Sequence, residues 1–463
     1  MILNIVPDQI QGLDPAIAAK LQKLLNVYNT HSAKNAEKER FYEGKISLNS
    51  VNLGIALPDG LSRLEIGCAW GAKCVDVLAA RSMFDGFVGL NGEDVEEIDR
   101  LVVSNRLIAS YMVACRDELK YGCTFATLSK DPKIGCKIRF HSPQTAAAVW
   151  DGDLGRIAYG MAIIDTAPDN DSGDTWSPSL INMYLDDAVI VFRRNGSVWS
   201  FDSFANPMGR PLMEPLTWNA TSAKPFGRSR IKEPVRNLIK DYVRTIANAT
   251  IALEFATSPQ KYLLGVTDEQ YDAVINQKFK QYVGSIIAST PNPETGASPT
   301  FGQLQQGSLT PHVEKLRMIS TQFSAATGLT VTDVGVVNDA NPTSSDAILA
   351  QSQTLVGMAE QLNTGNGDAL RMIALMALAI SQDTTLDQLS EEQRALVAHF
   401  KNPARPSVAV SADAALKIAG ARQSFAGTDT FLEMLGFDKA DIRRIRAQER
   451  LNQGVQTLLN EFS

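Results

Sequence analysis

Six basic residues lie in two segments that read as helices, and the four in the first segment recur every four residues. They are Lys232, Arg236, Lys240 and Arg244 in the first segment, and Lys315 and Arg317 in the second. Such side chains can stay solvated, pair with Asp or Glu of another subunit, or guide phosphate groups without reading sequence. The sequence leaves these alternatives open, because it does not show which way the side chains point.

A second candidate is the segment 329–341, which is polar and carries no positive charge. Its candidate site residues are Thr330, Thr332, Asp333, Asn338, Asp339 and Asn341. Lysines would hold a polyanion through counterion release, whereas uncharged polar groups touch it weakly and aspartates repel it. The segment could also be a plain connector between two helices.

Patterns typical of catalytic and metal sites are missing from the sequence. There is no Gly-x-x-x-x-Gly-Lys-Ser/Thr loop and no evident Ser/His/Asp set. Cys115 and His141 could be imagined as a pair, but core positions explain them better. The five cysteines, an odd number without a Cys-x-x-Cys pair, and four scattered histidines favour buried thiols over a zinc site. We expect no catalysis, no cofactor and no metal.

The composition is that of a folded protein with several parts. The 463 residues are 44% hydrophobic and 21% charged, and a chain of this length is expected to form roughly two to four domains. The 44 basic and 51 acidic residues give a net charge of −7. That balance argues against a protein that grips duplex DNA, although not against one through which DNA slides. Without a signal-like start or a long apolar span, the chain is expected to fold in the cytosol, away from membranes.

Periodicity predicts an α+β fold in which a helical base carries an antiparallel sheet. Helical spacing of apolar residues is found over 14–42, 70–81 and 95–115. The period then changes to two, which predicts strands over 137–141, 157–164, 179–185 and 188–194. Asn195-Gly196 predicts a hairpin turn, and the Pro- and Gly-rich run 206–225 predicts a connector.

Two long helices are expected to flank an insert. The first spans about 230–256 and begins near Lys232, because Pro234 fits only in a first helical turn. Its apolar stripe is Ile231, Val235, Leu238, Tyr242, Ile246, Ala249 and Leu253. The second runs from Thr310-Pro311 to Thr327-Gly328. The insert between them is expected to hold a helix over 268–283 and strands over 284–289 and near Phe301.

The C-terminal part is expected to be mostly helical. A helix should begin after Asn341-Pro342, where Thr343 and Asp346 have capping-box spacing, and Gly365 and Gly367 should break it. A very apolar helix follows over 368–380. The segment 407–411 (SVAVS) predicts extended structure, and further helices are expected over 412–424 and 438–459.

Several of these stretches together resemble one family. They are YEG at 42–44, WGAKCVDVLAARSMFDGF at 70–87, FGRSRIKEPVRNLI at 226–239, SPQKYLLG at 258–265, LTPHVEKLRMISTQFSAATGL at 309–329 and NPTSSDAILA at 341–350. This text is similar to that of portal proteins of tailed bacteriophages, of the type found in phages of Gram-positive hosts. The chain departs from the family at Ala69, where relatives have Asn, and at Thr330, where they often have Pro.

The resemblance implies a portal fold with an α/β wing, a two-helix stem, a small α/β clip and a helical C-terminal crown, assembled as a ring. The implied segments are wing 1–228, stem helix 229–256, clip 257–309, stem helix 310–328, tunnel loop 329–342, wing return 343–411 and crown 412–463. The tunnel loop would line the narrowest part of the channel. Clip strands such as 285–289 and 299–304, which lack obvious partners within the insert, would pair across subunits.

The implied function is that of a dodecameric ring at one capsid vertex of the virion, assembled in the host cytoplasm. Double-stranded DNA would pass through it without sequence specificity, inward during packaging and outward at ejection. The implied partners are further copies of the chain, the terminase large subunit, head-completion or adaptor proteins, scaffold and the major capsid protein. A separate ATPase would supply the energy.

Two alternatives remain. LEIGCAWG at 64–71 resembles the first motif of S-adenosylmethionine-dependent methyltransferases, in which a strand runs into a glycine-rich turn. Here Ala69 and bulky Trp70 follow the glycine, and no alternation of strands and helices comes after them. The other alternative is a ring-forming structural protein through which no DNA passes.

Overall fold

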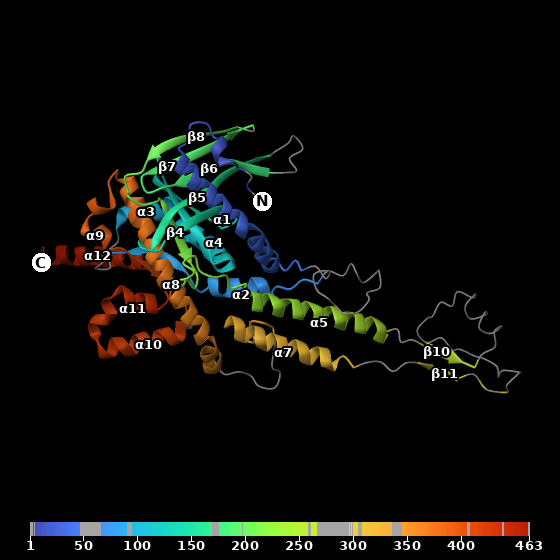
Figure 1. The fold of residues 1–463 in the computed structure, drawn as a ribbon. Coiled ribbons are helices and arrows are strands. Elements are labelled where there is room, and N and C mark those ends of the chain that lie inside the picture. Colours follow the sequence, from blue (N-terminus) through green and yellow to red (C-terminus); the bar gives the residue numbers. More distant parts are fainter. Residues whose placement is uncertain are drawn as a thin grey trace. The chain divides into compact units, whose positions relative to one another are not determined.

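The structure is a computed structural model that describes residues 3, 5–46, 66–89, 95–168, 176–196, 198–257, 261–265, 296, 298, 300–303, 308–335, 345–404, 408–437 and 439–461. The chain forms two compact units. The first unit comprises Met1–Asn35, Asp76–Ser229 and Thr343–Ser463, and the second comprises Ala36–Val75 and Arg230–Pro342. Figure 1 shows the helices and strands of each unit.

The first unit is built around two antiparallel sheets. The larger sheet has the order β4 (Ala146–Asp151), β5 (Arg156–Pro168), β6 (Trp176–Tyr184), β7 (Ala188–Asn195) and β8 (Val198–Ala205). The smaller has the order β3 (Gly135–His141), β2 (Cys123–Asp131) and β9 (Met213–Thr217). A separate antiparallel pair joins β1 (Phe84–Val88) to β12 (Val397–Phe400). The α+β class and the strands predicted at 137–194 are confirmed.

The hairpin predicted at Asn195-Gly196 is also confirmed, because Asn195 pairs with Val198 and Gly196 has φ 63°. The strand β9, in contrast, lies in the run 206–225 that composition predicted to be a connector. Its pairing with β2, for example Met213 with Thr127, depends on residues far away in sequence. Local composition could not show this pairing.

Helix α1 (Pro15–Tyr42) covers one face of the larger sheet within the first unit. Its inward side chains Leu21, Leu24, Leu25 and Tyr28 are nearly fully buried, and they pack in one core with Ile181, Met183, Ile190 and Phe192. Burying each such side chain contributes about 1.5–3 kcal/mol. The short helix η1 (Pro7–Gln9) precedes α1.

The helix predicted over 95–115 is two helices, so that prediction was wrong. Helix α3 (Glu96–Ser104) ends at Asn105, and α4 (Leu107–Tyr121) follows Arg106, which has φ 49°. Asn105 explains the break, because its side chain binds outside the helix. Its amide nitrogen donates to the Cys136 carbonyl at 2.9 Å, and its amide oxygen accepts from the Ile138 N–H at 2.8 Å.

Helix α8 (Ser345–Ser381) is continuous for 37 residues, so the break predicted at Gly365 and Gly367 was wrong. A glycine costs only about 1 kcal/mol in a helix interior. Asn366 between the two glycines is fully buried and donates hydrogen bonds to Tyr111 Oη at 3.0 Å and Glu118 Oε2 at 2.7 Å. Packing of this kind outweighs the local propensity.

The C-terminal part is helical, as expected, with different bounds. Short elements η3 (Leu386–Gln388) and α9 (Glu391–Arg394) precede β12, and α10 (Val408–Ala421), η4 (Gln423–Gly427), α11 (Asp429–Met434) and α12 (Lys439–Glu461) follow it. The extended structure predicted for 407–411 was wrong, because Val408 already begins α10. Five alternating residues are too few to distinguish a strand from the first turn of an Ala-rich helix.

The second unit is organised by helices α5 (Glu233–Thr257) and α7 (Thr310–Thr327), which lie side by side. Pro234 falls in the first turn of α5, and Gly328 ends α7 with φ 71°, both as predicted. Between the helices, β10 (Lys261–Leu264) pairs antiparallel with β11 (Thr300–Gln303). The expectation that the strand near Phe301 lacks a partner within the insert was therefore wrong. The predicted helix 268–283 and strand 284–289 lie outside the described residues.

Candidate functional site in the hairpin of helices α5 and α7

A buried apolar stripe holds the hairpin together. It consists of buried residues spaced by four: Ile231 just before α5, then Val235, Ile239, Val243, Ala247 and Ile251 on α5. On α7, Ile319 and Phe323 are fully buried. This is not the stripe that periodicity singled out. Of that stripe Ile231 and Val235 are buried, Leu238, Tyr242 and Ile246 are half-buried, and Leu253 is 50% exposed.

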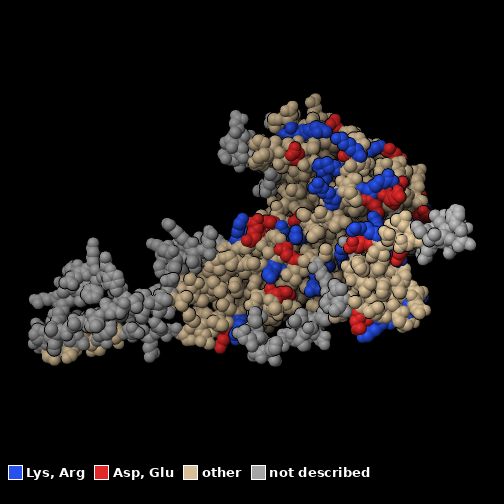
Figure 2. All heavy atoms as spheres, turned by 180° about the vertical axis from the view of Figure 1, so that it is seen from behind, with Lys and Arg blue, Asp and Glu red and all other residues tan. Residues whose placement is uncertain are grey.

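Helix α5 therefore carries half-buried and exposed apolar residues beside its buried stripe, so its apolar surface is wider than the part that the chain itself covers fully. On α7, Val313 and Met318 are likewise 50% and 45% exposed. Figure 2 shows that the surface of the hairpin in that view carries few charged side chains. Apolar surface of this kind on a rod-like element is typical of an interaction face.

Aromatic packing fixes the base of the hairpin. The Trp70 ring, at the start of α2 (Trp70–Ala79), lies 4.3 Å from the Tyr242 ring of α5 and 4.6 Å from the Phe323 ring of α7. At Gly71, a Cβ atom would lie 1.9 Å from the Phe41 carbonyl oxygen. The Trp70-Gly71 pair thus has a structural role, to let α2 approach the end of α1 closely while its aromatic ring joins both helices.

A buried arginine ties the two helices at the same end. The Arg230 guanidinium donates to the Cys74 carbonyl and, at 2.6 Å, to the Thr327 carbonyl at the end of α7. Burial lowers the pKa of Arg230. The residue thereby satisfies a helix-terminal carbonyl that would otherwise lack a partner.

The six basic residues predicted as one set have different surroundings. Arg236 lies 3.7 Å from the Glu37 carboxylate and donates to the Ile231 carbonyl. The Lys240 ammonium lies 5.6 Å from the centroid of the Phe41 ring. Both are committed to contacts within their own chain. Lys232 and Arg317 are exposed.

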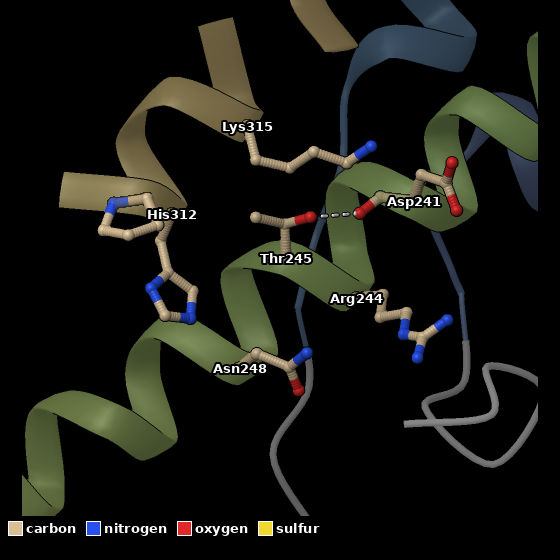
Figure 3. A pocket seen from close by; sticks show the side chains of 7 residues that line it. Asp241, Arg244, Thr245, Asn248, His312 and Lys315 are labelled. Carbon is tan, nitrogen blue, oxygen red and sulfur yellow. Dashed lines mark hydrogen bonds between the residues drawn. The ribbon is translucent and has the colours of Figure 1, made fainter. Parts of the chain in front are cut away.

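Arg244 and Lys315, the remaining two, come together at a pocket between α5 and α7. The pocket has a volume of about 480 Å³ and is lined by Asp241, Arg244, Thr245, Asn248, Pro311, His312 and Lys315. Figure 3 shows His312 and Lys315 reaching from α7 toward the α5 side chains. Thr245 is already engaged, because its hydroxyl donates to the Asp241 carbonyl at 2.8 Å.

Sequence reasoning missed four polar residues of this pocket. Asp241, Thr245 and Asn248 share a face of α5 at steps of four and three, and His312 is three residues before Lys315 on α7. That spacing is a usable signal. It becomes visible only when the antiparallel register of the two helices is known.

The segment after α7 is a turn whose side chains bind one another. The Thr330 hydroxyl donates to Asp333 Oδ2 at 2.8 Å and accepts from the Asp333 N–H at 3.1 Å. The Thr330 N–H also donates to that carboxylate. This pairing gives Thr330 a role that proline could not fill. Thr332 is exposed, whereas Asn338, Asp339 and Asn341 lie outside the described residues.

The residues considered for enzyme chemistry form no such site. Cys115 is fully buried, and burial raises the pKa of its thiol. His141 Nε2 lies 3.0 Å from the Thr127 hydroxyl, and burial lowers the pKa of His141 to about 4. Among the described residues there is no cluster of His, Cys, Asp and Glu suited to a metal ion, and no helix long and apolar enough to cross a membrane.

The methyltransferase motif also has another explanation. Leu64 and Glu65 lie outside the described residues, and Trp70 and Gly71 serve the packing given above. Every strand pair in the described part of the chain is antiparallel. A doubly wound methyltransferase sheet requires parallel strands.

Comparison with known proteins shows that the chain is similar to a class of phage proteins, the portal proteins. The chain is 23% identical to the portal protein of Mycobacterium phage D29 over 457 residues, covering 95% of this chain and 90% of that one. It is 23% identical to the portal protein of Mycobacterium phage L5 over 421 residues, covering 88% and 82%. The resemblance to portal proteins of phages of Gram-positive hosts is confirmed, and the chain is a homologue of these proteins.

The chain was also compared with solved structures and with protein-family models. Solved structures of the neck of an empty and a native GTA particle align with 80% of this chain, at TM-scores of 0.46 and 0.45 and identities of 14% and 12%. The alignments include 90% of the chain from the empty particle and 89% of the chain from the native particle. No family model matches the sequence.

Proposed function

We propose that the chain is the subunit of a portal ring of twelve copies at one capsid vertex, through which double-stranded DNA enters and leaves the particle. The observation that carries the proposal is the end-to-end match, which includes 95% of this chain and 90% of a curated portal protein. A match of that extent includes both units. It does not come from one shared motif.

The proposed segments follow from this role. The α5–α7 hairpin is the stem, the segment between these helices is the clip, and the segment after α7 is the tunnel loop. The first unit provides the wing, with α10–α12 as the crown. In this arrangement the clip meets the terminase large subunit during packaging and head-completion or adaptor proteins afterwards. Scaffold and the major capsid protein contact the ring within the shell.

The half-covered apolar face of α5 supports a ring. Leu238 and Ile246 are half-buried and Leu253 is 50% exposed, beside a stripe of α5 that its own chain covers. Helix faces of this kind become stable when a neighbouring copy covers them. The proposed ring has a structural role, and the energy for moving DNA comes from a separate ATPase.

Electron microscopy of the purified full-length chain tests the proposal. We expect rings with a central hole, and a mass by native mass spectrometry near twelve times the 50.3 kDa subunit. A chain that stays monomeric at high concentration would overturn the proposal. Rings that assemble into heads yet play no part in DNA packaging would instead favour a structural ring without DNA passage.

A further inference from the structure

The pocket between α5 and α7 has more positive than negative charge. Arg244 and Lys315 supply two cations and Asp241 one carboxylate, which leaves one net positive charge. Within the described part of the chain, neither Arg244 nor Lys315 has an ion-pair partner within 4.0 Å. The other two cations on this part of α5, Arg236 and Lys240, do have contacts within their own chain.

The same pocket holds polar atoms that lack partners. His312 Nδ1 and Asn248 Oδ1 are both buried and make no hydrogen bond with the described residues. Buried polar atoms normally have a partner, because leaving one unpaired costs about 1–3 kcal/mol. The two cations and the His312 ring, which donates from Nδ1 in one of its tautomers, can meet an incoming acceptor, whereas Asn248 Oδ1 can only accept a hydrogen bond.

The charge of the pocket favours a single carboxylate as the incoming acceptor. One carboxylate would balance the net charge of one and could accept hydrogen bonds from the Arg244 guanidinium or from the Lys315 ammonium. A phosphate of DNA would meet the same cations, but the Asp241 carboxylate in the pocket lining opposes a more highly charged polyanion. The pocket therefore fits a protein side chain better than a nucleic acid backbone.

We propose that the carboxylate is Glu314 of a neighbouring copy of this chain, so that each pocket is completed by the next subunit in the ring. This inference rests on the ring proposed above. Glu314 is exposed on α7 and has no ion pair with any described residue. A contact in which one copy offers the acid and the next offers the pocket is heterologous, the type of contact that closes into rings.

The position of Glu314 along the hairpin supports this choice. It immediately precedes Lys315, so the two residues differ in height along α7 by only about 1.5 Å. Rotation about a ring axis that runs along the hairpin brings residues of equal height together. Glu233, an exposed acid of α5 outside the pocket, is 11 residues before Arg244, which places it about 16 Å away along the helix.

Charge reversal tests the pairing. We expect Arg244→Glu and Glu314→Arg each to raise the subunit concentration for half-maximal ring formation at least about tenfold, because each places like charges at every subunit contact. The double variant should restore ring formation to within about threefold of the wild type, because the pair is re-formed in the opposite sense. Ring formation is measured by mass photometry over a dilution series, at low and high salt.

Matched controls separate this pairing from a general charge effect. Arg317→Glu and Glu233→Arg change residues of the same two helices that are also exposed but lie outside the pocket, and these variants should assemble like the wild type. Circular dichroism should show that every variant folds. Single variants that assemble normally, or a double variant without rescue, would overturn the inference while leaving the ring proposal intact.

Two further outcomes are also decisive. If the single variants form rings but lose affinity for duplex DNA, the pocket is a phosphate site, and the inference fails. If the wild-type chain forms no rings at all, the proposed function fails first.

Discussion

At position 118 a glutamate occupies the interior of the first unit. Glu118 is fully buried on α4, where Oε2 accepts a hydrogen bond from Asn366 and Oε1 has no partner among the described residues. Burial raises the pKa of Glu118 from 4.5 to about 8. The carboxyl group is therefore protonated at neutral pH, as a neutral member of a network with Tyr111 and Ser82.

This protonation predicts how stability depends on pH. Since the pKa of Glu118 is higher in the folded state, the folded chain binds a proton that the unfolded chain loses above pH 4.5. Its contribution to stability is full below that pH and is lost as pH rises through about 8. The neutral variant Glu118→Gln should lack this decline, which amounts to at most about 1.4 kcal/mol per pH unit.

Thermal unfolding of both proteins at pH 5, 6, 7 and 8 checks this expectation. The stability of Glu118→Gln relative to the wild type should increase as pH rises, because only the wild type must keep a proton on residue 118 in the folded state. Glu96→Gln, at an exposed position of α3, is the control and should leave the pH profile of the wild type unchanged. Parallel profiles for Glu118→Gln and the wild type would show that Glu118 titrates normally.

At the scale of elements, sequence predicted what depends on neighbours along the chain. The two helices around 230–328 and their ends followed from Pro234 and Gly328, and four strands of the first unit followed from alternation. Prediction from sequence failed where contacts with residues far away in sequence determine where a helix ends or which strands pair. Asn105 ends α3 by binding β3, Asn366 holds α8 together between two glycines, and β9 pairs with β2.

The candidate site shows the same division. Arg244 and Lys315 were recognised as candidates because charge is visible in a sequence. Their separation from Arg236 and Lys240 was not visible, since a step of four turns steadily around a helix and each cation meets different neighbours. The polar residues that complete the pocket, such as His312 and Asn248, needed the pairing of α5 with α7 to be known.

Two glycines in helices give a matched test of how packing and propensity compete. Gly365 in α8 is exposed, with no atom within 4 Å of an added Cβ, so Gly365→Ala should raise the free energy of unfolding by about 0.5–1 kcal/mol. Gly71→Ala should lower it by about 1–3 kcal/mol or more, because the new Cβ would lie 1.9 Å from the Phe41 carbonyl oxygen.

Thermal or chemical denaturation of the two variants beside the wild type measures both effects. The same substitution, Gly to Ala within a helix, is expected to raise the free energy of unfolding at position 365 and to lower it at position 71. If Gly71→Ala were as stable as the wild type, the close approach of α2 to the end of α1 would not exist in the protein in solution. If Gly365→Ala were destabilising, α8 would not be continuous through that position.

At the scale of the whole molecule, the chain carries its function in surfaces that it leaves incomplete. In the proposed ring another copy covers the apolar surface of α5 and fills the pocket beside α7, whereas the turn after α7 forms its hydrogen bonds within itself. Thr330 and Asp333 are hydrogen-bonded to each other, and neither side chain carries a positive charge that would attract phosphate. Weak contact is what a channel for sliding DNA requires, because a basic lining would hold the phosphates.

Shortening that turn tests the proposed tunnel loop. Deletion of Val331–Gly335 leaves α7, its glycine end and the α5–α7 hairpin in place, so we expect rings to assemble as in the wild type. DNA packaging, or retention of packaged DNA, should fall at least about tenfold, because the loop would no longer reach the duplex. A variant with these five residues replaced by Gly and Ser keeps the length of the loop and separates the effect of reach from that of side chains. In vitro packaging with nuclease protection gives the measurement. Full packaging and retention in the deletion variant would mean that the segment is a connector, and the narrowest part of the channel would then have to be formed by other residues.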